Sequence, residues 1–200
     1  MSQCSFCTEK AQYQDPETGQ YVCLQHTRLR VVAAGQRSTA TLLNIRPATA
    51  SDRGHIEQLS LYFWDETEVD CFDRPYDVTR CPAFLACDGA EVVGLAVYAS
   101  ERDLDAAVLV ILSVLPSYQG RGAGRALLDA VCGEAAQCGL ARVLVATSND
   151  DLPALALYQR CGFHLTGVIP GIIAQHHGAE LPGFAGIPIR DEIRFAYPLT

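Results

Sequence analysis

The sequence predicts an α/β (α+β) fold in which a mixed central sheet carries flanking helices, with a small metal-binding module in front of it. Three observations lead to this prediction. Hairpin-like apolar runs open the body of the chain, strand–helix–strand patterns follow them, and residues 1–33 carry cysteines and a histidine in pairs. Hairpins followed by strand–helix–strand units give a sheet with both parallel and antiparallel strands. Paired soft ligands in a segment too short for its own core indicate a structural metal ion.

Composition is that of one globular body with a small appendage. The chain has 200 residues, of which 49% are hydrophobic and 19% charged. No apolar run approaches the roughly 20 residues of a membrane span, and no basic-then-apolar leader opens the sequence. With six of the nine cysteines at no framework spacing, we expect a reduced, cytoplasmic protein without a membrane partner. The net charge of -8 argues against nucleic acid and suits a cationic amine.

The N-terminal module, residues 1–33, is expected to bind Zn²⁺. Turn-forming residues 15–19 separate two C-x-x-C/H pairs, and alternating segments flank the turn as in a short zinc-ribbon or treble-clef hairpin. Three thiolates and one imidazole complete a tetrahedron without an open position, so the ion is structural. A redox pair and a chance cluster are the alternatives. The expected ligands are Cys4, Cys7, Cys23 and His26.

The body, residues 42–200, follows a linker at residues 34–41. Apolar alternation and β-rich runs predict strands at 42–46, 83–87, 92–99, 106–115, 143–147, 163–169 and 189–197. Helical periodicity predicts helices at 51–63, with Ser51 as N-cap, at 122–138 and at 153–160. We expect residues 64–82 to be irregular, and the stretch with His176 and His177 to be a plain loop.

A glycine-rich stretch, "PSYQGRGAGR" at residues 116–125, lies between a predicted strand and a predicted helix. Glycines at a helix start let the backbone approach a ligand closely, and the free N–H groups with the helix dipole suit a pyrophosphate. Arg121 and Arg125 add positive charge. The spacing fits neither a dinucleotide fingerprint nor a P-loop, and a simple tight turn is the alternative.

Two motifs in the body resemble the GNAT acetyltransferase superfamily. The family signature Gln/Arg-x-x-Gly-x-Gly/Ala is matched by "QGRGAG" at residues 119–124, and the later aromatic before Gly-Phe is matched by "ALYQRCGF" at 156–163. The closing "GIPIRDEI" at 186–193 is similar to a subgroup of bacterial GNAT proteins. The resemblance covers residues 44–200 and leaves the N-terminal module outside.

The resemblance implies acetyl-CoA as donor and a small-molecule or peptide amine as acceptor, with direct attack in a ternary complex. It implies that the Val114 N–H polarises the acetyl carbonyl and that Tyr158 protonates the departing thiolate, with a core aromatic as the lesser alternative for Tyr158. Asp151 stands where the family often has Asn, and Asn149 is a possible substitute. The implied cofactor contacts are Leu112, Ser113, Val114, Gln119, Gly120, Arg121, Gly122, Ala123, Gly124, Arg125, Asn149, Asp151 and Tyr158.

The general base is left open by the sequence, because the predicted central strands carry no carboxylate where some family members have one. Glu66 or Glu68, or Asp191 and Glu192 near the last strand, are the candidates, and a water chain is a further one. The first pair could also be an ordinary acidic loop. The second could be a solvated strand face with an ion pair to Arg194.

The leading hypothesis is therefore an acetyl-CoA-dependent N-acetyltransferase with a fused structural zinc module. An alternative from another class is a non-catalytic acyl-CoA sensor whose zinc module docks a protein partner or a second subunit. A zinc-dependent nucleic-acid binder ranks last, because residues 1–37 show no basic stripe and the body is acidic.

Overall fold

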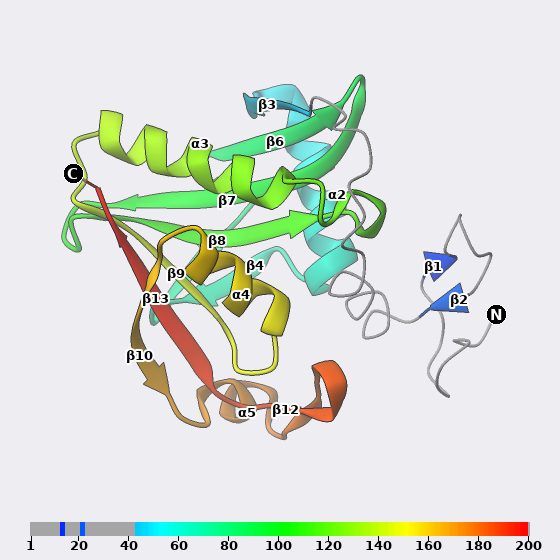
Figure 1. The fold of residues 1–200 in the computed structure, drawn as a ribbon, viewed down its shortest axis with the longest axis vertical. Helices are drawn as coiled ribbons and strands as arrows, with labels where there is room; N and C mark the ends of the chain where they lie inside the picture. Colours follow the sequence, from blue (N-terminus) through cyan, green and yellow to red (C-terminus); the bar gives the residue numbers. More distant parts are fainter. Residues whose placement is uncertain (1–12, 15–20, 23–42, 200) are drawn as a thin grey trace.

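A seven-stranded sheet organises the body of the protein (Figure 1). The computed structural model describes residues 13–14, 21–22 and 43–199. Within these residues the strand order is β10-β13-β9-β8-β7-β6-β3, with β8 and β9 parallel and the other neighbours antiparallel, which confirms the mixed sheet. The strands are β3 Asn44–Pro47, β6 Ala83–Asp88, β7 Glu91–Glu101, β8 Ala106–Val114, β9 Arg142–Ser148, β10 His164–Ile169 and β13 Glu192–Pro198.

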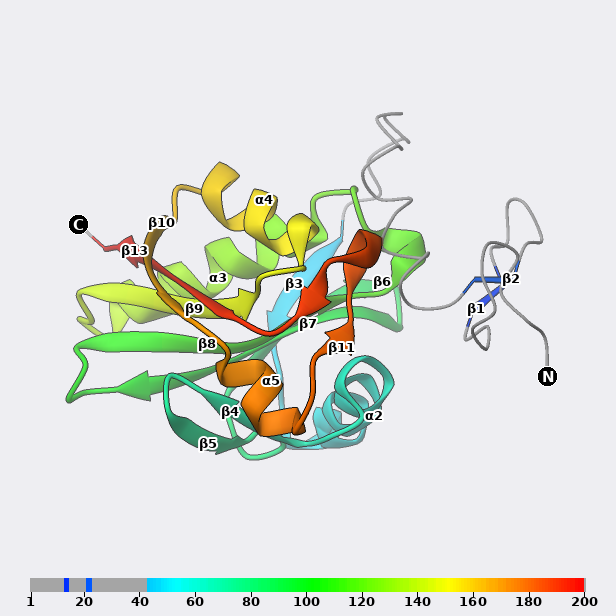
Figure 2. The ribbon, with the colours of Figure 1, turned by 90° about the horizontal axis from the view of Figure 1, so that it is seen from below.

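Helices cover both faces of this sheet (Figure 2). Helices α3 and α4 lie on one face, while α2, α5 and the β4–β5 hairpin lie on the other. The helices are α2 Arg53–Trp64, α3 Ala123–Gln137, α4 Leu152–Arg160 and α5 Ile172–His177. The remaining short elements are β4 Glu68–Cys71, β5 Arg74–Asp77, β11 Leu181–Pro182, β12 Pro188–Ile189, η1 Ala50–Asp52, η2 Pro116–Tyr118 and η3 Phe184–Gly186.

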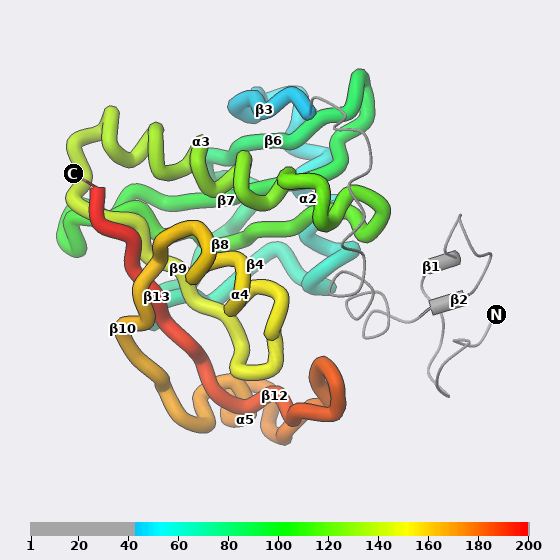
Figure 3. The backbone as a smooth tube through the Cα atoms, viewed as in Figure 1, coloured from blue at the N-terminus to red at the C-terminus, as the bar shows by residue number. Residues whose placement is uncertain are grey.

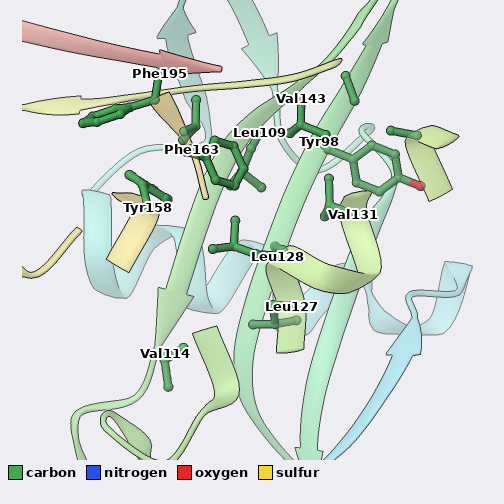
Figure 4. Close-up of a cluster of buried hydrophobic side chains, with 14 of the residues drawn as sticks. Tyr98, Leu109, Val114, Leu127, Leu128, Val131, Val143, Tyr158, Phe163 and Phe195 are labelled. Carbon is green, nitrogen blue, oxygen red and sulfur yellow. The ribbon is translucent and has the colours of Figure 1, made fainter. Parts of the chain in front are cut away.

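The larger apolar core lies between the sheet and α3, as predicted from the periodicity of that helix. Leu127, Leu128 and Val131 are fully or almost fully buried, and they face side chains from β8 and β9 (Figure 4). Their spacing of one, three and four residues places them on a single stripe of a 3.6-residue helix. Tyr158 of α4 joins the same core beside Phe195 of β13.

The opposite core is covered partly by a hairpin where we predicted irregular structure, and that prediction is wrong. Strands β4 and β5 pair antiparallel, and Val69 and Cys71 turn inward while Glu68 turns outward. The turn consists of Phe72 and Asp73, both at positive φ of 52° and 61°. Such turns are usually formed by Asn and Gly, so the sequence contained no turn signal.

Two further differences concern element ends. The helical region begins earlier than expected: Thr49 precedes η1, and its N–H and hydroxyl both donate to the Asp52 carboxylate at 2.8 and 2.7 Å. Ser51 is therefore not the N-cap. The single strand predicted at 189–197 is interrupted between β12 and β13, and the stretch predicted as a plain loop contains α5.

In residues 1–33, where we predicted the N-terminal module, the structure describes one feature, a two-stranded ladder. Strand β1 Tyr13–Gln14 pairs antiparallel with β2 Tyr21–Val22, which confirms the hairpin predicted around residues 15–19. The zinc ligands predicted at Cys4, Cys7, Cys23 and His26, and the predicted linker 34–41, lie outside the described residues.

The described part of the chain has neither a membrane-spanning helix nor a metal-binding cluster. No helix there is long and apolar enough to cross a membrane. No group of three or more His, Cys, Asp or Glu side chains in residues 43–199 is arranged to hold a metal ion.

Candidate active site

The central feature is a wedge between two parallel strands. Strands β8 and β9 pair only from Ala106 with Arg142 to Leu109 with Val145, and the chain trace then shows them diverging (Figure 3). The register between β7 and β8 shifts at the same level, which makes Val110 an extra residue in β8. A bulge of this kind bends a strand and increases its twist. It therefore accounts for β8 leaving β9.

Backbone groups of β8 face this wedge. The Leu115 N–H donates to Val93 O at 2.8 Å. Because hydrogen-bonded and non-hydrogen-bonded pairs alternate in an antiparallel ladder, Leu112 and Val114 direct their N–H and C=O groups away from β7. The same alternation directs the backbone of Ser113 toward β7 instead. The cofactor contact predicted for Ser113 stays a prediction, and in this register its backbone groups face β7.

The glycine-rich stretch forms an open cradle at the start of α3. Gly120 has φ +75° and Gly122, the residue before the helix, has φ +91°, both in the region that favours glycine. A Cβ at either position would meet nothing within 4 Å. No N–H group of residues 120–125 donates to another described residue, and the first helical bond is Ala126 N–H to Gly122 O. These amides and the helix dipole suit an anion.

The polar residues around the cradle are held by contacts with neighbouring side chains and backbone. Gln119 Nε2 donates to Val114 O at 2.8 Å, which ties the cradle to the end of β8. The Arg121 guanidinium lies 5.2 Å from the centre of the Tyr118 ring, and Arg125 lies 3.7 Å from Asp129. Both arginines are close enough to the helix start to add charge for a phosphate.

Two small residues allow α3 to start close to its neighbours. Ala123 is buried, and a Cβ at Gly124 would lie 3.3 Å from the Leu157 side chain of α4 and 4.0 Å from that of Val114. The signature glycine thus serves close packing between the cradle, α4 and β8.

Tyr158 reaches the core from α4 and is 5% exposed. Its ring packs against Phe163 and Phe195 with centroids 5.7 and 5.8 Å apart. Burial, and secondarily the negative charge of Asp151, raise the pKa of Tyr158 far above its usual value near 10. No described residue hydrogen-bonds its hydroxyl. Tyr158 therefore keeps its proton throughout the neutral pH range.

The other face contributes an aromatic side chain at the wedge. Trp64, at the end of α2, donates from Nε1 to Ser113 Oγ at 3.2 Å and remains 44% exposed. The sequence did not single out this contact. It brings an apolar surface next to the last residues of β8.

The β9–α4 turn uses its polar side chains internally. Asp151 Oδ1 accepts from Ala154 N–H at 3.2 Å and so caps α4. The Asn149 side chain bonds to the backbone of residues 188–191. The cofactor contacts predicted for Asn149 and Asp151 stay predictions, and neither side chain is free for them in this arrangement.

The candidate bases lie in two places. Glu66 and Glu68 border an open groove of about 650 Å³, and Glu68 turns away from the sheet. Glu192 pairs with Arg194, as the alternative interpretation of this strand expected. Asp191 instead pairs with Arg190 at 2.9 Å and accepts the Gly171 N–H at 2.8 Å. A base role for any of them stays a prediction.

One buried carboxylate escaped the sequence analysis entirely. Asp150 is completely buried and accepts from the Phe184 N–H at 2.8 Å. The run Ser148–Asp151 directly after a strand was the available signal, because short polar side chains there are typical of turns that bond to nearby backbone.

Comparisons with known proteins agree with the observed fold. Residues 42–163 match the family described as Acetyltransferase (GNAT) family. An uncharacterized protein of Bacillus subtilis, YdhI, is 32% identical over 138 residues, covering 66% of this chain and 84% of that one. The L-amino acid N-acyltransferase MnaT of Escherichia coli is 26% identical over 133 residues, covering 62% and 77%. A Bacillus subtilis acetyltransferase solved in complex with CoA superposes with a TM-score of 0.65 at 23% identity, covering 79% and 99%.

Proposed function

The chain belongs to the GNAT family of acetyltransferases, and from that premise we propose that it transfers the acetyl group of acetyl-CoA to an amine acceptor by direct attack in a ternary complex. One observation supports the proposal: the cradle, β8 and α4 meet at Gly124, where a Cβ would lie 4.0 Å from Val114 and 3.3 Å from Leu157, the residue before Tyr158. An anion site, a carbonyl-polarising backbone and an acid are the groups that this transfer needs.

The cradle is proposed to hold the pyrophosphate. Its unpaired amides, from Gly120 to Arg125, receive the phosphate oxygens, and the two arginines add charge. The pantetheine arm then runs along the open edge of β8, where the backbone of Leu112 is free to pair with its amides. This arrangement brings the thioester next to the Val114 N–H.

The transfer is proposed to proceed through a tetrahedral intermediate. The amine nitrogen attacks the thioester carbon, and the Val114 N–H stabilises the oxyanion that develops. The carbon–sulfur bond then breaks, and the Tyr158 hydroxyl gives its proton to the leaving thiolate. The amine loses its own proton to a base, for which Glu66 and Glu68 remain the proposed residues together with a water relay.

The acceptor is proposed to be a primary amine of a small molecule or a peptide. The relative MnaT is named for L-amino acids, and another relative, 32% identical over 138 residues, is named an aminoglycoside N(6')-acetyltransferase. The net charge of -8 favours a cationic acceptor.

A panel of amines tests the function directly. Purified protein is given acetyl-CoA with an L-amino acid sulfone, an aminoglycoside, spermidine or a peptide with a free N-terminus, and thiol release is followed. We expect turnover with at least one amine, confirmed by the mass of the acetylated product. Tight acetyl-CoA binding without turnover on any amine would favour the acyl-CoA sensor instead.

We also propose that residues 1–33 form a separate zinc module with Cys4, Cys7, Cys23 and His26 as ligands and residues 34–41 as the linker to the body. The β1–β2 ladder supports this, because it reverses the chain between the two ligand pairs. Structural zinc in small modules is worth roughly 10–16 kcal/mol and is folding free energy there. The body has its own two apolar cores, so the module's proposed use is to dock a partner protein or a second subunit.

Metal analysis of protein purified without a metal-binding tag tests the zinc module. We expect about one zinc per chain, lost when Cys4 and Cys23 are both replaced by Ser. Chelation should leave CoA binding by the body unchanged. Zinc retained by the double variant would contradict the site, and CoA affinity lost on chelation would contradict the separation of module and body.

A further inference from the structure

Residues 170–191 lie at the open end of the wedge. They connect the edge strand β10 to β13, and β13 begins at Glu192, which pairs with Ser148, the last residue of β9. Because β8 and β9 diverge toward their carboxyl ends, the segment enters the sheet where the wedge is widest (Figure 1). Its helix α5 lies on the same side of the sheet as α2 and the β4–β5 hairpin (Figure 2).

Asn149, in the turn after β9, bonds to this segment through its whole amide. Its Oδ1 accepts from the N–H groups of Arg190 and Asp191 at 3.0 and 2.9 Å. Its Nδ2 donates to Pro188 O at 2.9 Å, and its own backbone N–H donates to Asp191 O at 2.9 Å. One residue therefore fixes the carboxyl-terminal end of the segment.

Asp150 fixes the middle of the segment. Its buried carboxylate accepts from the Phe184 N–H at 2.8 Å and from the Ser148 hydroxyl, and no cation pairs with it among the described residues. A buried carboxylate is costly without such hydrogen bonds. A Cβ at Gly183 would lie 2.6 Å from Asp150 Oδ2 and would also overlap Ile187 O. The segment thus touches the carboxylate with bare backbone.

We propose that Asn149 and Asp150 are positioning residues that hold residues 170–191 as one wall of the acceptor site. The inference rests on the proposed acetyl transfer. The turn that carries both residues leads directly into α4, which carries Tyr158. The same turn therefore positions the wall and the proposed proton donor. The phosphate cradle lies at the start of α3, on the face of the sheet opposite α5. We therefore expect Asn149 and Asp150, here called the clamp, to affect binding of the acceptor and not binding of the cofactor.

Steady-state kinetics on three variants test the clamp, with acetyl-CoA and the amine that turns over fastest in the panel as substrates. Asn149→Ala removes the side-chain bonds, Asp150→Ala removes the buried carboxylate, and Gly183→Ala pushes the segment off Asp150. We expect the KM for the amine to rise about tenfold or more in each, with the KM for acetyl-CoA within about twofold of wild type.

Two controls separate positioning from general damage. Asp150→Asn keeps an oxygen for the Phe184 N–H and lets its amide donate to Ser148 Oγ, so its KM values should be near those of the wild type. Gly133→Ala in the exposed part of α3, where a Cβ meets nothing within 4 Å, should change neither KM. Hydrogen exchange of residues 170–191 should accelerate in the three variants and not in the two controls.

Three outcomes would overturn the inference. A rise in the KM for acetyl-CoA as large as that for the amine would make Asn149 a cofactor contact, as the family resemblance implied. An unchanged amine KM in a variant whose segment exchanges faster would separate the segment from the acceptor. Wild-type protein that binds acetyl-CoA but acetylates no amine would refute the proposed function itself, and the wild type alone reveals that case.

Discussion

Helices α3 and α2 cover opposite faces of one sheet, and they are held there differently. Helix α3 buries five side chains, all apolar, along its 15 residues. Helix α2 buries two along its 12 residues, and one of them is Ser60. Its exposed face carries large apolar side chains with exposures of 40–46%: Leu61, Tyr62 and Trp64.

Helix α2 is held mainly by side-chain contacts at its two ends, because few side chains along its middle are buried. Before its start, Asp52 of η1 pairs with Arg46 at 2.7 Å and accepts from Thr49. At its end, Trp64 donates to Ser113. Packing along a whole helix fixes it cooperatively, whereas a helix tethered at both ends depends on single contacts. The cofactor face is therefore expected to be the rigid one and the acceptor face the adjustable one.

The largest expected effect is on turnover, when the proposed acid Tyr158 on the α3 side of the sheet is replaced. Tyr158→Phe keeps the packed ring and removes the proton, so turnover should fall ~10²–10⁴-fold while stability and acetyl-CoA affinity stay the same. Because burial raises the pKa of Tyr158, wild-type activity should show no loss from this group below about pH 10. Stopped-flow or steady-state thiol release across pH measures both.

The matched control is Tyr98→Phe, which removes the hydroxyl of another tyrosine that packs in the same core and is labelled apart from Tyr158 in Figure 4. It should leave turnover unchanged. Wild-type turnover in Tyr158→Phe, when chemistry limits the rate, would rule out the acid role.

The cradle gives the next effect. Gly122→Val places a branched side chain where the backbone is proposed to meet phosphate, and CoA affinity should fall about a hundredfold, equivalent to about 2.8 kcal/mol. Gly139→Val is the matched control, since Gly139 has a similar positive φ of 70° and open space at the other end of α3. Calorimetry with CoA compares the two. Equal affinity in both variants would place the phosphate elsewhere.

Exchanging Ser and Ala at buried positions of α2 and α3 should change the free energy of unfolding in opposite directions. Ser60 Oγ is buried and has no partner among the described residues, so Ser60→Ala should raise the free energy of unfolding by about 1 kcal/mol. The inverse change in α3, Ala135→Ser, should lower it by at least as much, because it buries a hydroxyl beside apolar neighbours. Urea denaturation measures both. A destabilised Ser60→Ala protein would show that the hydroxyl holds a buried water.

The smallest effect is a pH dependence at the start of α2. The hydrogen bond from Arg46, and then those from Thr49, lower the pKa of Asp52 from its usual 3.8. The stabilisation is therefore complete above about pH 5 and is lost as the pH falls toward the lowered folded-state pKa. Asp52→Asn should destabilise the protein at pH 7, with a smaller deficit at pH 3. A deficit that does not change with pH would mean that shape, not charge, matters at this position. Asp129→Asn, in an exposed pair, should have little effect at either pH.

The same contrast explains what the sequence could predict. Regular apolar periodicity identified α3 and the long strands, because their side chains follow a repeating pattern. The β4–β5 hairpin was missed because Phe72 and Asp73 occupy a turn that usually needs Gly or Asn. Within the site, the family motif indicated the cradle and Tyr158, while the bonds of Asn149 and Asp150 join residues about 35 to 40 positions apart. Local spacing carries no signal for such contacts.

A single inserted residue separates this sheet from one without a wedge. Val110 and Ile111 both belong to the α2-side core, whereas Leu109 and Leu112 face α3. Without Val110, every other pairing between β7 and β8 would be unchanged, and alternation would run unbroken. Most insertions in a buried strand move the following side chains to the wrong face of the sheet. An insertion that forms a bulge leaves the side chains of both faces in place. In a gene this is one codon, so a closed sheet can acquire a ligand gap in one mutational step without repacking its core.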